Sequence, residues 1–448
     1  LDNVKAMNLN SVVVQIRPTA DALYKSSLNP WSEVLTGTQG KSPGYDPLEF
    51  MVQEAHNRNI EFHAWFNPFR VTNDTKPKVF SKDSVVSKYP GYVVNYDGKK
   101  YIDPGIPEAR KLVVDSVMEV VTNYDIDGIH FDDYFYPYPS GSAAFPDNGS
   151  YKKYSRGFED KNAWRRDNID LFIKEVYENV KAAKPYVKVG VSPFGIWRST
   201  ANDPNGADVN SSVSSYDSLH ANTAFWAEKG WIDYIAPQIY WELANKNTPY
   251  GKVFDFWVKL NNKYPDVQLY IGHAGYKIGQ AGWKNKNELP NQLKRDRSYR
   301  ETSGSILYNY SSLISNPLGF ADILKSEIYK YPALVPQTKN PSQAVPKEPK
   351  IISATRSPNN SNLVTFSSND KGSSYFVVYK NAGTSAPYIN DPACIAKIIR
   401  NNGDTIQYFS DTSISEGSDY TYIVTAFDRY NTESKISNIA TAKAYTAK

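Results

Sequence analysis

The sequence contains little sulfur and no long apolar run. Its 448 residues include one cysteine and three methionines. A single cysteine, Cys394, cannot form an intrachain disulfide or supply a cysteine-rich zinc site. No apolar run approaches the roughly 20 residues that a transmembrane helix requires. These absences exclude a disulfide scaffold, a zinc ribbon and a membrane-spanning helix in this sequence.

Excess charge and cofactor motifs are also scarce. The 51 Lys and Arg against 47 Asp and Glu leave a net charge of +4, with no basic tract, so we expect no nucleic-acid partner. The five histidines are dispersed without metal-ligand spacing. No glycine-rich phosphate motif follows a predicted strand. The segment "GVSPFG" (190–195) lacks the G-x-S-x-G form of a serine nucleophile. We therefore expect no metal and no cofactor.

Short apolar strands alternate with amphipathic helices over residues 1–334, which indicates a parallel sheet covered by helices. Seven strand–helix units can be counted, whereas a closed barrel has eight. The sequence predicts a (βα)8 TIM-type barrel whose first strand lies upstream of residue 1; an open doubly wound sheet is the alternative. The predicted strands are 11–17, 60–68, 126–133, 187–194, 232–240, 267–274 and 304–310. The predicted helices are 46–59, 106–124, 163–183, 218–229, 251–264, 288–300 and 317–330.

The composition changes after this region. Residues 335–350, "VPQTKNPSQAVPKEPK", are rich in Pro, Lys and polar residues and indicate a linker. Residues 351–448 contain short alternating strands separated by turn residues, which is typical of an immunoglobulin-like β-sandwich. The segment 419–437 resembles the penultimate strand of fibronectin type III modules. The first ten residues lack an initiator Met and a signal peptide, so we expect a processed chain.

Two acids, Asp132 and Asp133, end the predicted strand "DGIHFDD" (127–133). Because side chains alternate along a strand, His130 and Asp132 should point into the barrel. Chemistry in such barrels is located at the carboxyl ends of the strands. Each acid also has a structural interpretation: Asp133 as a turn cap, and Asp132 as the partner of Arg17.

Other strands end in polar and aromatic side chains that a core does not need. They include Gln15, Arg17, His63, Trp65, Asn67, Ser192, Phe194, Gln238, Tyr240 and Glu242. His63 and His130 have the alternative interpretation of core histidines bonded to neighbours. Trp31, Trp65, Trp197 and Trp241 lie on or beside loops after strands, where they either pack or stack on a sugar face.

The segment 134–158 is predicted to be a long loop rich in aromatic residues and stiffened by prolines. Its rings, Tyr136 among them, offer apolar area and hydroxyl groups at low entropic cost. A carbohydrate presents the matching mixture of CH faces and hydroxyls. We therefore expect the acids to perform bond chemistry and the rings to hold the sugar.

Several long segments resemble the bacterial glycosyl hydrolase-like family ten. They are "VVVQIRPTADALYKSSLNPWSEVLTGTQGKSPGYDPLEF", "AHNRNIEFHAWFNPFRV", "DGIHFDDYFYPYP", "WRRDNIDLFIKEVY", "VGVSPFGIWR" and "DYIAPQIYW", within residues 1–332. The resemblance implies a TIM-type barrel and an exported protein, periplasmic or at the cell surface. It also implies a hydrolase acting on peptidoglycan glycan strands that carry no peptide.

The resemblance also implies site residues. Asp132 and Asp133 lie inside the motif and are the expected catalytic acids. Glu242 is the expected second carboxylate because it is the nearest acid beyond a strand end, and Asp21 is its rival. The remaining motif positions expected to contact the substrate are Arg17, Asp21, His63, Asn67, Arg70, Gln238, Tyr240 and Trp241. Trp31, Trp65, Tyr136, Phe194 and Trp197 are added from the strand-end and loop arguments.

The chitinase-type pattern D-G-x-D-x-D-x-E provides a contrast. This chain has His130 and Tyr134 where that pattern has an acid and its proton-donating Glu. The chitinase-type mechanism is therefore not assigned, and an N-acetyl-assisted route with another proton donor stays open. We predict a monomeric glycoside hydrolase in which two carboxylates flank the glycosidic oxygen. The alternative is a glycan-binding protein that keeps the barrel and has lost the chemistry. A metal-dependent deacetylase is disfavoured by the absent ligand spacing.

Overall fold

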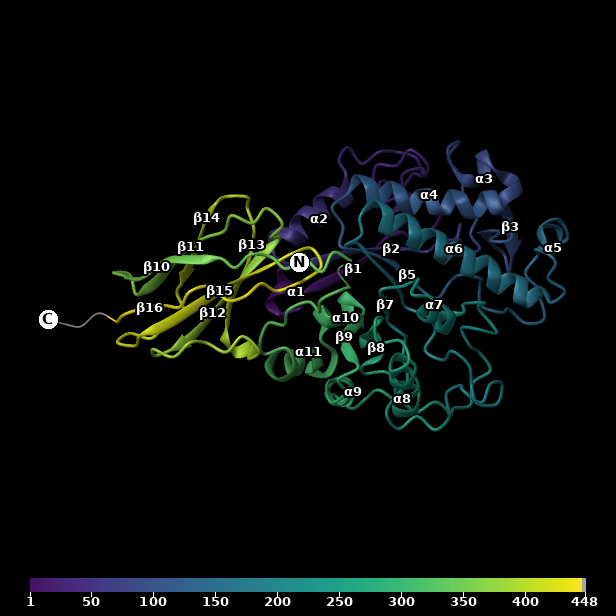
Figure 1. Cartoon of the computed structure of the whole chain (residues 1–448). Helices are drawn as coiled ribbons and strands as arrows, with labels where there is room; N and C mark the ends of the chain where they lie inside the picture. The colour runs from purple at the N-terminus through teal and green to yellow at the C-terminus, as the bar shows by residue number, and fades with distance from the viewer. Residues whose placement is uncertain (340, 445–448) are drawn as a thin grey trace. The chain divides into compact units, whose positions relative to one another are not determined.

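The computed structural model describes residues 1–339 and 341–444, which group into two compact units (Figure 1). The larger unit comprises Ser11–Gln53 and Glu61–Leu324. The smaller unit comprises Leu1–Asn10, Glu54–Ile60 and the chain from Lys325 onward. The predicted domain limits 1–334 and 351–448, with a linker at 335–350, stay a prediction. Among the described residues, no helix has both the length and the apolarity needed to cross a membrane.

The larger unit is built on one parallel sheet in which spatial order follows chain order, β1-β2-β5-β6-β7-β8-β9. Sequential parallel strands with helical crossovers curl into a TIM-type barrel. This confirms the predicted fold class, and each of the seven predicted strands is present. Their bounds are β1 Ser11–Arg17, β2 Glu61–Phe66, β5 Gly128–Phe131, β6 Lys188–Val191, β7 Tyr234–Ile235, β8 Gln268–Ala274 and β9 Thr302–Tyr308. Within the described residues, β1 and β9 are the two edges of this sheet.

Helices cover the outer face of the sheet, as predicted. The longest, α6 (Lys161–Ala183), begins at Asp160, whose carboxylate accepts hydrogen bonds from the amides of Asn162 and Ala163. Phe172 of α6 packs edge-on against Phe131 of β5, with ring centres 5.3 Å apart. Figure 1 shows α4 alongside α6. The other helices are α2 Pro47–Asn57, α4 Pro107–Asn123, α7 Thr223–Lys229, α8 Tyr250–Asn261, α9 Glu288–Arg297, α10 Tyr310–Ser315 and α11 Phe320–Ile323.

Some small elements were not predicted. The hairpin β3 (Val93–Tyr96) and β4 (Lys99–Ile102) and the short helix α3 (Val85–Lys88) lie between β2 and α4. The segment 134–158 is not a loop throughout, because it contains helix α5 (Asn148–Tyr154). Asp147 before α5 is fully buried and contacts Arg165 of α6 at 2.7 Å. This ion pair fixes the far end of the segment to the helix layer.

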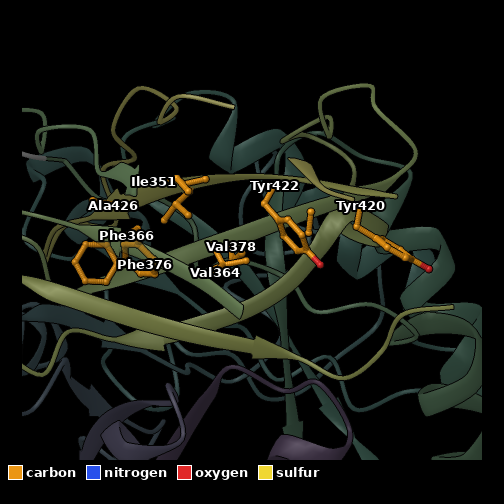
Figure 2. Close-up of a cluster of buried hydrophobic side chains, with 10 residues drawn as sticks. Ile351, Val364, Phe366, Phe376, Val378, Tyr420, Tyr422 and Ala426 are labelled. Carbon is orange, nitrogen blue, oxygen red and sulfur yellow. The ribbon is translucent and has the colours of Figure 1, made fainter. Parts of the chain in front are cut away.

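The smaller unit contains two antiparallel sheets, β10-β11-β14 and β13-β12-β15-β16. Side chains from both sheets form a buried hydrophobic cluster that includes Ile351, Phe366, Phe376 and Tyr422 (Figure 2). The all-β prediction is therefore confirmed; the fibronectin type III assignment stays a prediction. The strands are β10 Lys350–Ser357, β11 Ser361–Ser367, β12 Tyr375–Ala382, β13 Ile395–Arg400, β14 Ile406–Asp411, β15 Tyr420–Phe427 and β16 Ala440–Ala442, and α1 spans Asp2–Ala6.

Candidate functional site

Asp132 lies directly after β5, at the carboxyl end of the parallel sheet. Its side chain accepts hydrogen bonds from Trp65 Nε1 (3.1 Å), Asn67 Nδ2 (3.1 Å) and the Tyr134 backbone amide (3.1 Å). The residue is only 5% exposed. A carboxyl group has about four acceptor positions, so these three donors leave room for one proton.

Asp133 is equally buried but has different partners. The Tyr138 hydroxyl donates to its Oδ2, and Gln238 Nε2 donates to its Oδ1 at 3.1 Å. Gln238 also donates to the carbonyl of Ser192 at 2.8 Å, so the end of β6 orients the amide. All donors to this carboxylate are neutral groups. The structure therefore brings the predicted residues Asp132, Asp133 and Gln238 to one edge of the sheet.

Burial and mutual repulsion make this acid pair hard to ionise fully. Desolvation, followed by the nearby charge of Asp133, raises the pKa of Asp132 to about 7. Burial also raises the pKa of Asp133. Arg70 opposes both shifts through its positive charge. Two adjacent acids with raised pKa values can hold one proton between them near neutral pH, which is the state a proton donor requires.

A buried row of polar groups fills the barrel interior below the acids. Lys188 Nζ donates to Glu61 at 2.8 Å, and Glu61 lies 3.2 Å from His63 Nε2. The Tyr234 hydroxyl lies 2.9 Å from His63 Nδ1 and 2.8 Å from His130 Nδ1. Both histidines therefore point inward as predicted, and both are bonded to core neighbours. This placement matches the core-histidine interpretation.

Aromatic rings extend from Asp132 along the carboxyl end of the sheet. Trp65 contacts Tyr308 edge-on, with ring centres 6.4 Å apart, and Tyr308 stacks on Tyr240 at 6.4 Å. Tyr276 meets Tyr308 edge-on at 5.7 Å. Tyr276 is 38% exposed and Tyr308 is 42% exposed. We call Trp65, Tyr240, Tyr276 and Tyr308 the first ring row.

A second ring row continues from Asp133. Tyr138, whose hydroxyl bonds Asp133, meets Tyr134 at 5.4 Å and Phe194 at 6.2 Å. Phe194 meets Trp241 edge-on at 5.6 Å. Tyr134 is exposed, and the other three rings are half-buried. The open faces of such rings can stack on the CH faces of sugars. The two rows thus place apolar surface beside both members of the acid pair.

Arg17 and Asp21 hold the segments around the acids. Arg17, only 1% exposed, donates to Asn29 Oδ1 and to the carbonyls of Asn67 and Pro68, all at 3.1 Å. It braces the chain after β2 rather than pairing with Asp132. Asp21 is fully buried and accepts from Thr19 at 2.7 Å, with Gln39 as a second donor.

Glu242 lies beyond β7, two residues after Tyr240. Its carboxylate accepts from Asn245 at 2.9 Å, and it lies against Gly282, whose φ of +84° favours glycine. Lys277 Nζ donates to the Tyr240 carbonyl at 2.8 Å, which anchors this loop. Glu242 is half-buried, and its role as second carboxylate stays a prediction.

Two predicted tryptophans have other neighbours than the acids. Trp197 stacks on Phe256 at 6.0 Å. Trp31 pairs through its backbone with Ala22. Among the described residues, no cluster of three or more His, Cys, Asp or Glu side chains is arranged to hold a metal ion.

Tyr136 corrects one prediction. It is 2% exposed, accepts a hydrogen bond from Asn168 at 3.3 Å, and packs edge-on against Phe145 and His220. It is a packing residue and cannot contact a substrate directly. Tyr134 contacts Arg70 and Tyr138 bonds Asp133, whereas Phe135 and Tyr136 between them are buried.

We expect Tyr136→Ala to lower the free energy of unfolding by about 3–5 kcal/mol, because it deletes a buried ring. Tyr134→Ala, at a residue that is 38% exposed, should cost less than about 1 kcal/mol. Chemical denaturation of the full chain measures both values. Equal losses in the two variants would contradict this division of the segment into core and site.

The sequence argument missed Tyr276 and Tyr308. Both follow the rule used for the other strands, since Tyr308 ends β9 and Tyr276 comes two residues after β8. Applying the strand-end rule to the last two strands would have found them. Tyr234 was missed because a tyrosine within an apolar strand gives no signal of its polar partners.

Comparisons with known proteins agree on one family. The family model described as "Glycosyl hydrolase-like 10" matches residues 1–289. The chain is 42% identical over 451 residues to glycosyl hydrolase YngK of Bacillus subtilis (strain 168), covering 98% of this chain and 87% of that protein. It is 40% identical over 325 residues to glycosyl hydrolase DigH of Escherichia coli (strain K12), covering 69% of this chain and 73% of that protein.

Among solved structures, the glycoside hydrolase domain of PgaB (BpsB) from Bordetella bronchiseptica is similar, with 13% identity and a TM-score of 0.43. The match covers 72% of this chain and 90% of that one.

Proposed function

The chain belongs to the glycosyl hydrolase-like 10 family and is a glycoside hydrolase, and we propose that its substrate is the peptidoglycan glycan strand that carries no peptide. The observation that carries the proposed mechanism is the buried pair Asp132 and Asp133, one of whose pKa values is raised to about 7. Rings on both sides of the pair provide surfaces on which sugar units stack.

In the proposed mechanism Asp132 donates its proton to the glycosidic oxygen as the bond to the anomeric carbon breaks. Asp133 stays ionised, and its charge keeps the proton on Asp132 until negative charge develops on the glycosidic oxygen as its bond to the anomeric carbon breaks. A second carboxylate then acts on the sugar carbon or on the attacking water. We assign this role to Glu242, because Asp21 is buried and already held by Thr19 and Gln39.

We also propose that the protein is exported, to the periplasm or the cell surface, and that it acts there as a monomer. The substrate assignment supports export, because peptidoglycan lies outside the cytoplasmic membrane. Fractionation of cells that express the tagged full-length protein, followed by size-exclusion chromatography, tests both statements. Retention of the protein in the cytoplasm would contradict the first.

The purified chain should release reducing ends from peptide-free glycan strands. It should release far fewer from strands whose sugars still carry peptides, since a bulky substituent must pass the ring rows. Reducing-end assays with mass spectrometry of the products measure both. Binding without any cleavage would instead support a glycan-binding protein on a glycosidase scaffold.

A further inference from the structure

Arg70 is a positive side chain beside the acid pair, and it has no ion-pair partner within residues 1–339 and 341–444. Its Nε donates to the Pro18 carbonyl at 3.1 Å, and its guanidinium carbon lies 5.1 Å from the centre of the Tyr134 ring. Among the described residues, no carboxylate forms a salt bridge with it, although Asp132 and Asp133 both sense its charge. The two terminal nitrogens of its guanidinium are therefore available to an anion.

The residues that orient Asp132 also orient Arg70. Asn67 donates to Asp132 through Nδ2 (3.1 Å) and accepts the Arg70 backbone amide through Oδ1 (3.2 Å). Tyr134 donates its amide to Asp132 and offers its ring to Arg70. The position of the guanidinium relative to the acid is thus set by shared supports. A substrate group bound by Arg70 would be held at a fixed offset from the proton donor, which is how positioning lowers a barrier.

We propose that Arg70 binds a carboxylate carried by the glycan and so selects anionic sugars and places their glycosidic oxygen at Asp132. This inference rests on the proposed glycoside substrate and adds that the substrate must carry a negative charge. A planar guanidinium with free N–H groups matches a carboxylate in two-point contact, which a neutral hydroxyl cannot reproduce. Stacking on Tyr134 holds the fork in place before the substrate arrives.

Two sugar carboxylates have this chemistry: the lactyl ether of a muramic acid unit and the ring carboxylate of a uronic acid. In peptidoglycan the lactyl carboxyl is free only where no peptide is attached, because the peptide converts it to a neutral amide. A carboxylate-binding Arg70 would thus explain selection of peptide-free strands by charge as well as by size.

The charge balance of the site is consistent with this assignment. Arg70 lowers the pKa of both acids. When a substrate carboxylate neutralises Arg70, that lowering weakens, and Asp132 keeps its proton to higher pH. Binding of the anionic group therefore favours the acid form that the reaction uses.

The test compares Arg70→Gln with wild type and with Arg300→Gln, a surface control whose side chain is 92% exposed. Three substrates are used: peptide-free strands, the same strands with the lactyl carboxylate reduced to an alcohol, and an oligosaccharide of alternating uronic acid and N-acetylhexosamine. Readouts are kcat/KM from reducing ends, Kd by calorimetry and the thermal unfolding temperature.

We expect wild type to prefer the carboxylate-bearing strands over the reduced strands by roughly 10- to 100-fold, the value of a charge-assisted contact. Arg70→Gln should lose that preference, falling to the wild-type level on reduced strands, while Arg300→Gln keeps it. Arg70→Lys should recover only part, since it lacks the fork.

An equal loss on intact and reduced strands in Arg70→Gln would overturn the inference and assign Arg70 to the acid pair alone. If Arg70→Gln lowers activity only on the uronic acid substrate, the bound carboxylate is that of a uronic acid and not the lactyl group. Arg70 would still be a carboxylate-binding residue. If wild type cleaves none of the three, the proposed function fails. In that case the Kd values still test the carboxylate contact. Wild type should bind intact strands more tightly than reduced strands, and Arg70→Gln should bind the two equally.

Discussion

Asp132→Asn will lower hydrolysis of the glycan substrate by roughly a thousandfold, within the range expected for loss of a positioned general acid. The amide keeps the size of the carboxyl group, and its one oxygen can still accept from Trp65 and Asn67, so the fold should persist although the bond from the Tyr134 amide is lost. It has no proton of suitable acidity to give to the glycosidic oxygen. The measurement is kcat from reducing-end release, with circular dichroism to verify the fold and calorimetry to verify glycan binding.

Variants of the other acids serve as matched controls. Glu242→Gln should lower activity to a similar extent if Glu242 is the second carboxylate. If Asp21 has that role instead, Asp21→Asn will show the large loss and Glu242→Gln will not. Full activity of Asp132→Asn, with the mutation verified, would remove Asp132 from the mechanism. It would leave the ring rows as a glycan-binding surface without chemistry at this acid.

The kcat/KM for glycan hydrolysis should fall above pH 7, with a slope that approaches about tenfold per pH unit well above that value. Desolvation and the charge of Asp133 raise the pKa of Asp132 to about 7, and only the protonated acid can donate. As pH rises through that pKa the donor form is lost, so between pH 7 and pH 9 kcat/KM, which reports the free enzyme, should drop by roughly fiftyfold. Initial rates across this range in a constant-ionic-strength buffer test the statement.

Two neighbouring substitutions should shift the alkaline limb of the pH–activity profile in opposite directions. Asp133→Asn removes a negative charge that raises the pKa of Asp132, so the limb should shift to lower pH. Arg70→Gln removes a positive charge that lowers the same pKa, so the limb should shift to higher pH. Besides these two charges, Tyr134 and Tyr138 are titratable neighbours that interact electrostatically with Asp132. Shifts in the same direction would exclude Asp132 as the titrating group.

More of the fold than of the candidate site could be predicted from the sequence. Seven strands with helical spacers were predictable because the strands of a helix-covered parallel sheet have mostly apolar sequences such as "SVVVQIR". Asp132 and Asp133 were predictable because acids at a strand end have no place in a core. The contacts of Trp65, Asn67 and Gln238 with this pair followed from alternation along their strands.

Other features depend on tertiary packing and could not be predicted. Tyr136 and Tyr138 lie two positions apart in one aromatic run, yet one is in the core and the other bonds Asp133. Only the turns of the proline-rich segment decide which ring goes inward. The ion pair of Asp147 with Arg165, which holds that segment, joins residues whose spacing matches no motif.

The buried row that runs from Lys188 to His130 has a direction. A hydroxyl has one proton, so Tyr234 can donate to only one of the two imidazoles and must accept from the other. If Glu61, held by Lys188, accepts a hydrogen bond from His63 Nε2–H, then His63 Nδ1 accepts from the Tyr234 hydroxyl and His130 Nδ1–H donates to that hydroxyl. In this arrangement the two rings carry opposite tautomers. The hydrogen bonds that lead from His130 to Glu61 therefore all point the same way. The ion pair of Lys188 and Glu61 at one end determines the tautomer of His130 at the other.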